Sequence, residues 1–251
     1  MGSGSGAAMP PPQASGYQLK FSDDFDALSL SPSGTGKYTW YPGIWWEPTP
    51  PDGNISSSNS MVELDWTGGE SPTDTTITTF ARDGSSFQSW RYGYFEARMK
   101  WTPTTGAWPA FWLLSTEGGS SSAAPASETG EIDIFEGQGA SPTTYFGTIH
   151  DWVGNNDIYN NNNSNTYELP SDTDLSEYHL YGLLWTQGHV TWYFDNQEIG
   201  EYATSAVFDS QDYYILLSSQ EGADWSAGNT SGVNVSKMPL DIDWVHVFQM
   251  P

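Results

Sequence analysis

The sequence contains no cysteine, and this absence excludes a disulfide scaffold, a thiolate metal site and a cysteine nucleophile. Positive charge is also scarce, with 7 Lys and Arg against 31 Asp and Glu and a formal net charge of -24. Because so few cations cannot neutralise a phosphate backbone, no nucleic-acid partner is expected. No run approaches the roughly 18 apolar residues that span a membrane, so no membrane partner is expected either.

Aromatic side chains, by contrast, are abundant: 13 Trp, 14 Tyr and 11 Phe make up 15% of the chain. Because each can bury a large apolar area, the chain is expected to fold despite its charge. Residues 1–15 are mostly small residues and prolines without periodicity, which predicts a disordered tag or linker. Residues 16–251 have a length that suits one all-β domain.

Alternating and aromatic-rich segments recur between clusters of Gly, Pro, Asn, Asp and Ser, and they predict strands. The expected strands are Gln18–Phe21, Ser60–Asp65, Thr75–Phe80, Tyr92–Trp101, Ala107–Leu114, Gly130–Phe135, Tyr145–His150, His179–Thr186, His189–Phe194, Gln197–Tyr202, Tyr213–Ser219 and Asp241–Gln249. One short helix is expected around Ser205–Asp209. So many strands with so little helix predict an all-β sandwich or barrel.

Two of these strands carry polar groups and indoles on the face opposite their apolar side chains. Trp108 and Trp112 share one face of the first strand, and Glu131 and Asp133 share one face of the second. Surfaces exposed to water do not usually collect tryptophan. A face that combines indoles with carboxylates therefore indicates a cleft that binds sugar.

The segment Gly130–Gly137 holds three carboxylates, Glu131, Asp133 and Glu136, in an otherwise apolar stretch. On a regular strand Glu136 would face away from the other two, but a one-residue bulge at Ile134-Phe135 returns it to their side. With a rise of roughly 3.3 Å over about four effective steps, the Cα atoms of the two glutamates lie about 13 Å apart. Side chains that each reach roughly 3.5 Å leave about 6 Å between the carboxyl groups, close to the spacing of a retaining glycosidase.

These three carboxylates divide the work of such a reaction. One glutamate is expected to be ionised and one protonated, while Asp133 raises the pKa of the carboxyl that must keep its proton. The alternative is a solvated strand edge with lysine partners. Nearby loops hold almost no Lys or Arg, and Ile132 and Ile134 favour burial, where unpaired like charges are costly.

Several motifs in order along the chain extend this pattern from about Tyr17 to Gln249. They are Arg91–Arg98, Gly106–Trp112, Glu131–Glu136, Gly147–His150, Tyr178–Tyr181 with Trp185, and Asp241–Phe248. In these motifs the sequence resembles glycoside hydrolase family 16, the laminarinase and lichenase family. The resemblance implies a β-jelly roll of two curved antiparallel sheets, similar to concanavalin A.

The resemblance also implies roles: Glu131 as nucleophile, Asp133 as its assistant and Glu136 as acid/base, with no cofactor required for catalysis. The bulged spacing resembles laminarinases, agarases and carrageenases rather than bacillus-type lichenases. Calcium often rests on the convex sheet in this family, and Asp24, Gly53 and Asp243 match the places of its ligands.

Other residues are candidates for contact with the polysaccharide, each with core packing or loop anchoring as the alternative. The candidates are Trp46, Trp90, Tyr94, Trp108, Trp112, His150 and Trp225. Tyr94 stands where the family strand has an arginine, which places the exact substrate in question. An ion pair between Glu96 and Arg98 is also expected.

These observations favour a secreted, monomeric, retaining endo-β-glycanase that acts on β-1,3- or mixed β-1,3-1,4-glucan. A charge of -24 disfavours sulfated galactans, although Arg82, Arg91, Arg98 and Lys100 fall in one stretch. An agarase- or carrageenase-like galactan hydrolase is therefore the first alternative. A non-catalytic carbohydrate-binding protein and a transglycosylase on the same fold are the others.

Overall fold

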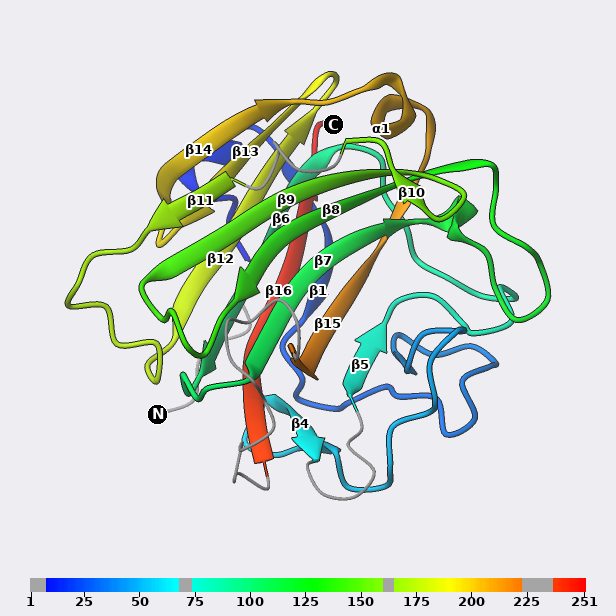
Figure 1. Ribbon diagram of the computed structural model, residues 1–251, viewed down its shortest axis with the longest axis horizontal. Helices are drawn as coiled ribbons and strands as arrows, with labels where there is room; N and C mark the ends of the chain where they lie inside the picture. The colour runs from blue at the N-terminus through cyan, green and yellow to red at the C-terminus, as the bar shows by residue number, and fades with distance from the viewer. Residues whose placement is uncertain (1–7, 68–73, 160–164, 223–236) are drawn as a thin grey trace.

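Two eight-stranded antiparallel sheets lie face to face as two layers (Figure 1). The structure is a computed structural model that describes residues 8–67, 74–159, 165–222 and 237–251. The strands enclose one hydrophobic core between the two layers. This arrangement confirms the predicted all-β sandwich.

The first sheet has the order β14-β13-β12-β6-β16-β4-β3, and β1 also pairs with the long strand β16. Its strands are β1 (Gln18–Asp23), β3 (Ile55–Ser57), β4 (Val62–Thr67), β6 (Gly93–Trp101), β12 (His179–Thr186), β13 (His189–Phe194), β14 (Gln197–Ala203) and β16 (Lys237–Gln249). In β6 the alternating residues Phe95, Ala97 and Met99 enter the core, so Tyr94 and Arg98 point to the opposite face.

The second sheet has the order β10-β9-β8-β7-β15-β5-β2, and β11 also pairs with β9. Its strands are β2 (Tyr41–Pro42), β5 (Thr75–Thr78), β7 (Ala107–Ser115), β8 (Glu128–Gly137), β9 (Thr144–Val153), β10 (Asn156–Asp157), β11 (Asn165–Glu168) and β15 (Tyr213–Glu221). Figure 1 shows β7, β8 and β9 side by side as long curved strands. They carry the functional site.

All twelve predicted strands are present, and four short ones were not predicted. The four are β2, β3, β10 and β11, each of two to four residues, which is too short to show an alternating pattern. The predicted short helix is confirmed as α1 (Ala206–Ser210), and two 3-10 turns, η1 (Pro12–Ala14) and η2 (Thr116–Gly118), complete the elements. Across the described ranges, no helix has the length and apolar character needed to cross a membrane.

Residues 8–15 differ from the predicted disordered linker. Ala14, in η1, is fully buried, and it packs with Tyr94, Tyr193 and Phe248 on the outer face of the first sheet. The Nε2 amide of Gln13 donates a hydrogen bond of 2.6 Å to the Tyr94 hydroxyl. Small residues and prolines have no periodicity, but they fit closely against an apolar patch, so this contact could not be read from the sequence.

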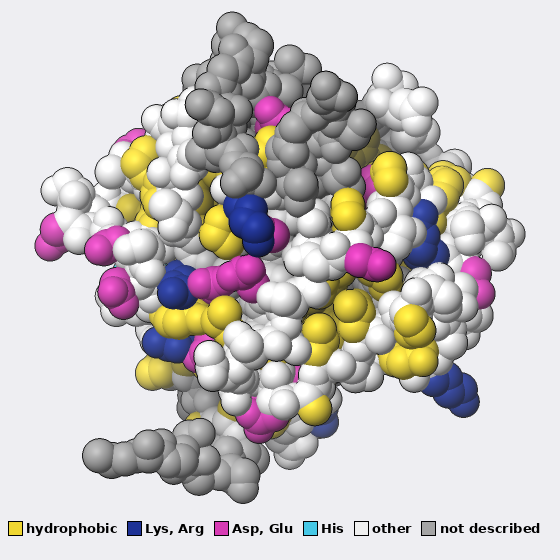
Figure 2. Space-filling view, turned by 90° about the horizontal axis from the view of Figure 1, so that it is seen from below, with side chains coloured by type: hydrophobic (Ala, Val, Ile, Leu, Met, Phe, Trp, Pro, Cys, Tyr) yellow, Lys and Arg dark blue, Asp and Glu magenta, His cyan; other side chains and the backbone are white. Residues whose placement is uncertain are grey.

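The few cations of the chain are mostly used in ion pairs. Among the described residues, four of the seven pair with a carboxylate: Arg91 with Asp212, Arg98 with Asp243, Lys100 with Asp241, and Lys237 with Asp65. Figure 2 shows one face of the surface, where several of the Lys and Arg side chains lie close to acidic ones. Most of the acidic side chains that the structure describes therefore have no Lys or Arg beside them, and the chain as a whole is strongly negative.

Candidate active site

A β-bulge in β8 decides where its carboxylates point. On the neighbouring strand β7, the consecutive residues Phe111 and Trp112 pair with Phe135 and Asp133, so Ile134 has no opposite residue. The register between β8 and β9 shifts over the same interval. One extra residue reverses the alternation of side chains along the rest of the strand. The predicted bulge is confirmed.

The bulge separates the side chains of β8 into two sets. Ile132, Ile134 and Phe135 are at most 1% exposed and belong to the core between the sheets. Glu131 and the other two carboxylates line a cavity of about 170 Å³ on the opposite face of the second sheet. The rest of the lining is Trp46, Glu47, Trp108, Ala110, Trp112 and Gln220. We call this cavity the cleft.

Three of the predicted sugar-binding tryptophans lie in the cleft: Trp46, Trp108 and Trp112. Trp46 is 48% exposed and stands edge-on to Trp45, whose Nε1 donates to the carbonyl oxygen of Gly118 at 3.3 Å. Trp112 is almost buried and its Nε1 donates to Oγ of Ser218 at 3.0 Å. The cleft therefore combines one indole that is free to stack on a ligand with one that is anchored in its floor.

Glu136 has the surroundings of a proton donor. It is 9% exposed, and the indole Nε1 of Trp108 donates to its Oε1 at 2.9 Å. Burial raises the pKa of Glu136 well above its usual value, and the negative charge of Asp133 raises it further. Glu136 is therefore expected to hold a proton at neutral pH.

Glu131 is better placed to be ionised. Burial and the charge of Asp133 raise its pKa to about 7, but nearby His150 and a hydrogen bond from Trp152 act in the opposite direction. The indole Nε1 of Trp152 donates to Oε2 of Glu131 at 3.0 Å. The two glutamates thus differ in pKa in the direction that separates a nucleophile from an acid.

His150 links two carboxylates. Its Nε2 lies 3.1 Å from Oδ2 of Asp133, and its Nδ1 lies 2.7 Å from Oδ2 of Asp157. Burial lowers the pKa of His150, but the hydrogen bond and charge of Asp133, with help from Glu131 and Asp157, raise it to about 11. The imidazole is therefore a cation held between two anions, and both of its nitrogens face protein.

Three further residues of the site were missed from the sequence. Trp152 lies two residues after His150 on β9, so the alternation of that strand places both on the face of the carboxylates, and the two rings stack with centroids 5.4 Å apart. Asp157 belongs to β10, too short to predict. Glu47 follows Trp46 into the cleft, and burial together with the charge of Asp74 raises its pKa to about 7.

Two predicted contact residues lie elsewhere. Tyr94 is fully buried on the outer face of the first sheet, where its hydroxyl donates to Oε1 of Glu96 at 2.9 Å. Trp90 is 8% exposed and packs in the core, with its ring centroid 5.3 Å from that of Phe21. Tyr94 belongs to β6 in the sheet opposite the cleft, and Trp90, which pairs with Tyr213 of β15, turns its ring into the core, so neither lines the cleft. Trp225 lies outside the described residues.

The calcium ligands suggested by the resemblance do not fit a cation. Asp243 is ion-paired with Arg98, which also replaces the expected pair between Glu96 and Arg98. Asp24 lies 3.2 Å from Nε2 of His246, while Gly53 contributes only a turn with φ 91°. A guanidinium beside Asp243 repels a second cation, so these three residues do not fit a calcium ion.

Within the described ranges, one group of three possible metal ligands lies close together. It consists of Glu131, Asp133 and His150, whose ligand atoms lie within 4.8 Å of one another. Those atoms already contact each other and Trp152, as described above. We therefore assign the group to proton chemistry.

A β sandwich with paired carboxylates in a cleft lined by indoles has the parts of a carbohydrate-cleaving enzyme. The model for "Glycosyl hydrolases family 16" matches residues 54–246, and the chain belongs to this family. The fold is accordingly that of its β-jelly rolls. The laminarinase catalytic domain of Thermotoga maritima superimposes with a TM-score of 0.72 over 93% of this chain and 98% of that one, at 22% sequence identity.

Among curated relatives, the endo-1,3-1,4-beta-glycanase EglC of Rhizobium meliloti is 29% identical over 92% of this chain and 51% of its own length. The glucan endo-1,3-beta-glucosidase A1 of Niallia circulans is 27% identical over 64% of this chain and 25% of its own length. The chain thus spans about half of the first relative and a quarter of the second.

Proposed function

We propose that this protein is a retaining endo-β-glycanase that hydrolyses β-1,3- or mixed β-1,3-1,4-glucan. The observation that carries the proposal is the bulge at Ile134, which places Glu131, Asp133 and Glu136 on one face of a cleft. The raised pKa of Glu136 relative to Glu131 supports the assignment of acid and nucleophile.

The reaction takes place in two displacements. Protonated Glu136 donates its proton to the glycosidic oxygen as the bond to the anomeric carbon breaks, and the carboxylate of Glu131 forms an ester with that carbon. In the second step ionised Glu136 takes a proton from water, and the hydroxide adds to the anomeric carbon as Glu131 leaves. Two inversions at one carbon retain its configuration.

Asp133 and His150 prepare the two glutamates for these steps. The charge of Asp133 raises the pKa of Glu136 and so helps it to keep its proton, while the cationic His150 opposes the rise that burial and Asp133 cause in the pKa of Glu131. This arrangement is a positioning and electrostatic role, because the imidazole nitrogens contact Asp133 and Asp157 rather than the cleft. His150 is therefore proposed to act on the carboxylates and not as a ligand of the sugar.

A neutral glucan suits the electrostatics of the protein. Among the described residues, none that lines the cleft is Lys or Arg, and the whole chain carries a charge of -24, so a sulfated polymer would be repelled. The activities for which EglC and the Niallia circulans relative are named support the same substrate class. Reducing-sugar release from laminarin, lichenan, agarose and carrageenan tests it, and faster release from either galactan than from both glucans would overturn it.

Replacing Glu131 with glutamine tests the nucleophile. Because glutamine keeps the shape but cannot form the ester, Glu131→Gln is expected to abolish hydrolysis while oligosaccharide binding survives. Binding is measured by calorimetry and turnover by reducing-sugar release. Glu198→Gln, on the exposed strand β14, is the matched control and is expected to keep full activity. Wild-type turnover in Glu131→Gln would refute the assignment.

We further infer that the enzyme acts outside the cell as a monomer and needs no cofactor for catalysis. A polysaccharide does not cross a membrane, so a hydrolase for it works where the polymer is. Carboxylates alone carry the proton transfers and the covalent step. Light scattering of the purified protein tests the monomer, and assay in the presence of a chelator tests the independence from metal.

A further inference from the structure

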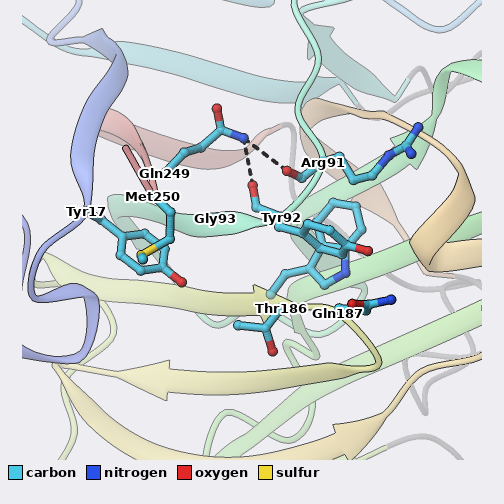
Figure 3. Close-up of a pocket in the computed structure, with 9 residues that line it drawn as sticks. Tyr17, Arg91, Tyr92, Gly93, Thr186, Gln187, Gln249 and Met250 are labelled. Carbon is cyan, nitrogen blue, oxygen red and sulfur yellow. Dashed lines mark hydrogen bonds between the residues drawn. The ribbon is translucent and has the colours of Figure 1, made fainter.

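A second cavity, of about 310 Å³, lies at the edge of the first sheet, and none of its residues belongs to the cleft (Figure 3). We propose that it is a second carbohydrate-binding site, which holds a neutral stretch of the β-glucan whose cleavage is proposed above. Its lining is Tyr17, Arg91, Tyr92, Gly93, Trp185, Thr186, Gln187, Gln249 and Met250. The volume falls at the lower end of known ligand pockets, about 300–1,000 Å³, which suits one or two sugar rings of a longer chain.

Aromatic rings stand on two sides of this cavity. Figure 3 shows Tyr17 on one side and Tyr92 on the other, with Thr186 between them. Tyr92 is held in place, because its ring packs edge-on against Trp185 at 5.1 Å and its hydroxyl donates to Oδ1 of Asp209 at 3.2 Å. Fixed aromatic faces bind the apolar faces of sugar rings with little loss of side-chain entropy.

Polar groups are available beside the rings. Within the part of the chain that the structure describes, the hydroxyls of Tyr17 and Thr186 and the side-chain amide of Gln187 have no protein hydrogen-bond partner. Together they offer donors and acceptors of the kind that sugar hydroxyls need. A few polar groups placed among aromatic ones are typical of a site that fixes the orientation of a neutral ligand.

The cavity is close to electrically neutral. Its one charged lining residue, Arg91, is ion-paired with Asp212 at 2.9 Å, and its Nε also donates to the carbonyl oxygen of Gln211 at 3.0 Å. A free cation that could attract a sulfate or phosphate is therefore missing from the lining. A neutral polysaccharide is the occupant that fits both the cavity and the negative charge of the chain.

The backbone beneath the cavity is tied down in its present form. Tyr92 adopts φ 62° and Gly93 φ 138°, and Nε2 of Gln249 donates to the carbonyl oxygens of Arg91 and Tyr92 at 3.1 and 3.0 Å, as the dashed lines in Figure 3 show. These bonds join the start of β6 to the end of β16. The walls are thus preformed, which lowers the cost of binding.

A second site changes how the enzyme meets a polymer. A long chain bound at one site is held at a high effective concentration near the other, whereas a short oligosaccharide occupies only one of them. The second site should therefore strengthen binding to polymeric glucan and leave binding of a short oligosaccharide in the cleft unaltered. This dependence on chain length separates it from a merely structural feature.

The test uses Glu131→Gln as background, so that the glucan stays intact. Tyr17→Ala and Gln187→Ala are expected to lower affinity for insoluble and soluble β-1,3-glucan by about 10-fold each, measured by pull-down and by gel retardation. Affinity for a short oligosaccharide should stay unchanged. Tyr38→Ala, an exposed tyrosine that lines neither cavity, is the matched control and should bind both ligands normally.

Gln187 is exposed in a hairpin, so its variant remains folded even if Tyr17→Ala is destabilised, and thermal unfolding checks both. Unchanged polymer affinity in Gln187→Ala and Tyr17→Ala overturns the second site. Equal loss for polymer and short oligosaccharide also overturns it, because it indicates damage to the cleft. Cleavage of a short oligosaccharide by the wild-type protein tests the proposed function separately, without the second site.

Discussion

At the scale of single residues, the two glutamates of the site have chemically identical side chains, but their surroundings differ. Glu136 accepts a hydrogen bond from Trp108 and Glu131 accepts one from Trp152. The charges of Asp133 and His150 act on both glutamates, and Glu131 is the one whose carboxylate lies within 4.8 Å of His150 and Asp133. Burial raises both pKa values, and the nearby cation limits the rise at Glu131. Environment, not residue type, therefore assigns their roles.

Asp157 is expected to act on this balance from behind His150. Its Oδ2 contacts Nδ1 of His150, and its Oδ1 accepts backbone hydrogen bonds from Asp151 and Tyr159 at 3.2 and 3.1 Å. Asp157→Asn keeps the oxygen for the backbone but removes the charge, so the pKa of His150 falls from about 11 while the imidazole stays protonated at neutral pH. The charge of Asp157 also raises the pKa of Glu131, so that pKa falls in the variant. The acid limb of kcat/KM against pH should move to lower pH.

A conservative variant serves as control for this prediction. Asp157→Glu restores the negative charge and is expected to return the profile toward that of the wild type. A uniform drop in kcat across all pH values, with no shift of the limb, would show that Asp157 only supports the fold. The imidazole pKa of His150, measured by NMR, gives a readout independent of activity.

At the scale of elements, the bulge in β8 is the feature on which the site depends. Inserting one glycine between Phe135 and Glu136 shifts the alternation by one residue and turns Glu136 toward the core, so turnover should fall by at least about 100-fold, the contribution of a general acid. Ile134→Val keeps the bulge, costs about 0.5–1.5 kcal/mol of stability and should keep near-normal activity. Wild-type turnover after the insertion, in a variant shown to be folded by circular dichroism, would contradict the account.

The sequence predicts this element well because the bulge changes the alternation of apolar and acidic residues. The apolar Ile132, Ile134 and Phe135 can all face the core while the three carboxylates face the cleft only if the strand contains one extra residue. Local alternation also shows which residues of a strand share a face. It does not show which sheet the strand joins, and for this reason Tyr94 was placed in the cleft although β6 lies in the opposite layer.

Contacts between distant segments are the other part that the sequence hides. Ala14 packs on Tyr94, and Asp157 reaches His150 from a two-residue strand, yet neither position has a local pattern. Trp152 is the exception, since its spacing from His150 was enough to place it on the same face of β9. Short strands and packed termini depend on tertiary contacts, which periodicity does not encode.

At the scale of the whole molecule, buried acids make stability depend on pH. Glu96 is 5% exposed, and burial raises its pKa to about 7, against a hydrogen bond from Tyr94 that lowers it. A carboxyl with a raised pKa in the folded state stabilises the fold fully below its unfolded pKa of about 4.5, and this contribution is lost as pH rises through 7. The loss attributable to Glu96 is about 3 kcal/mol.

Glu96→Gln removes this titration. Its free energy of unfolding, measured with urea, should exceed that of the wild type at pH 8 and change less between pH 5 and pH 8. Glu198→Gln, on an exposed strand, should follow the wild type throughout. A Glu96→Gln variant that is less stable than the wild type at pH 8 would show that the carboxylate contributes favourable contacts when charged.

The anomeric configuration of the first product tests the central claim most directly. If Glu131 and Glu136 work as nucleophile and acid/base across one linkage, a proton NMR spectrum recorded within minutes of mixing should show the β-anomer, with the α-anomer appearing only later by mutarotation. Release of the α-anomer first would mean a single inversion by water, and the assignment of Glu131 as a covalent nucleophile would be wrong.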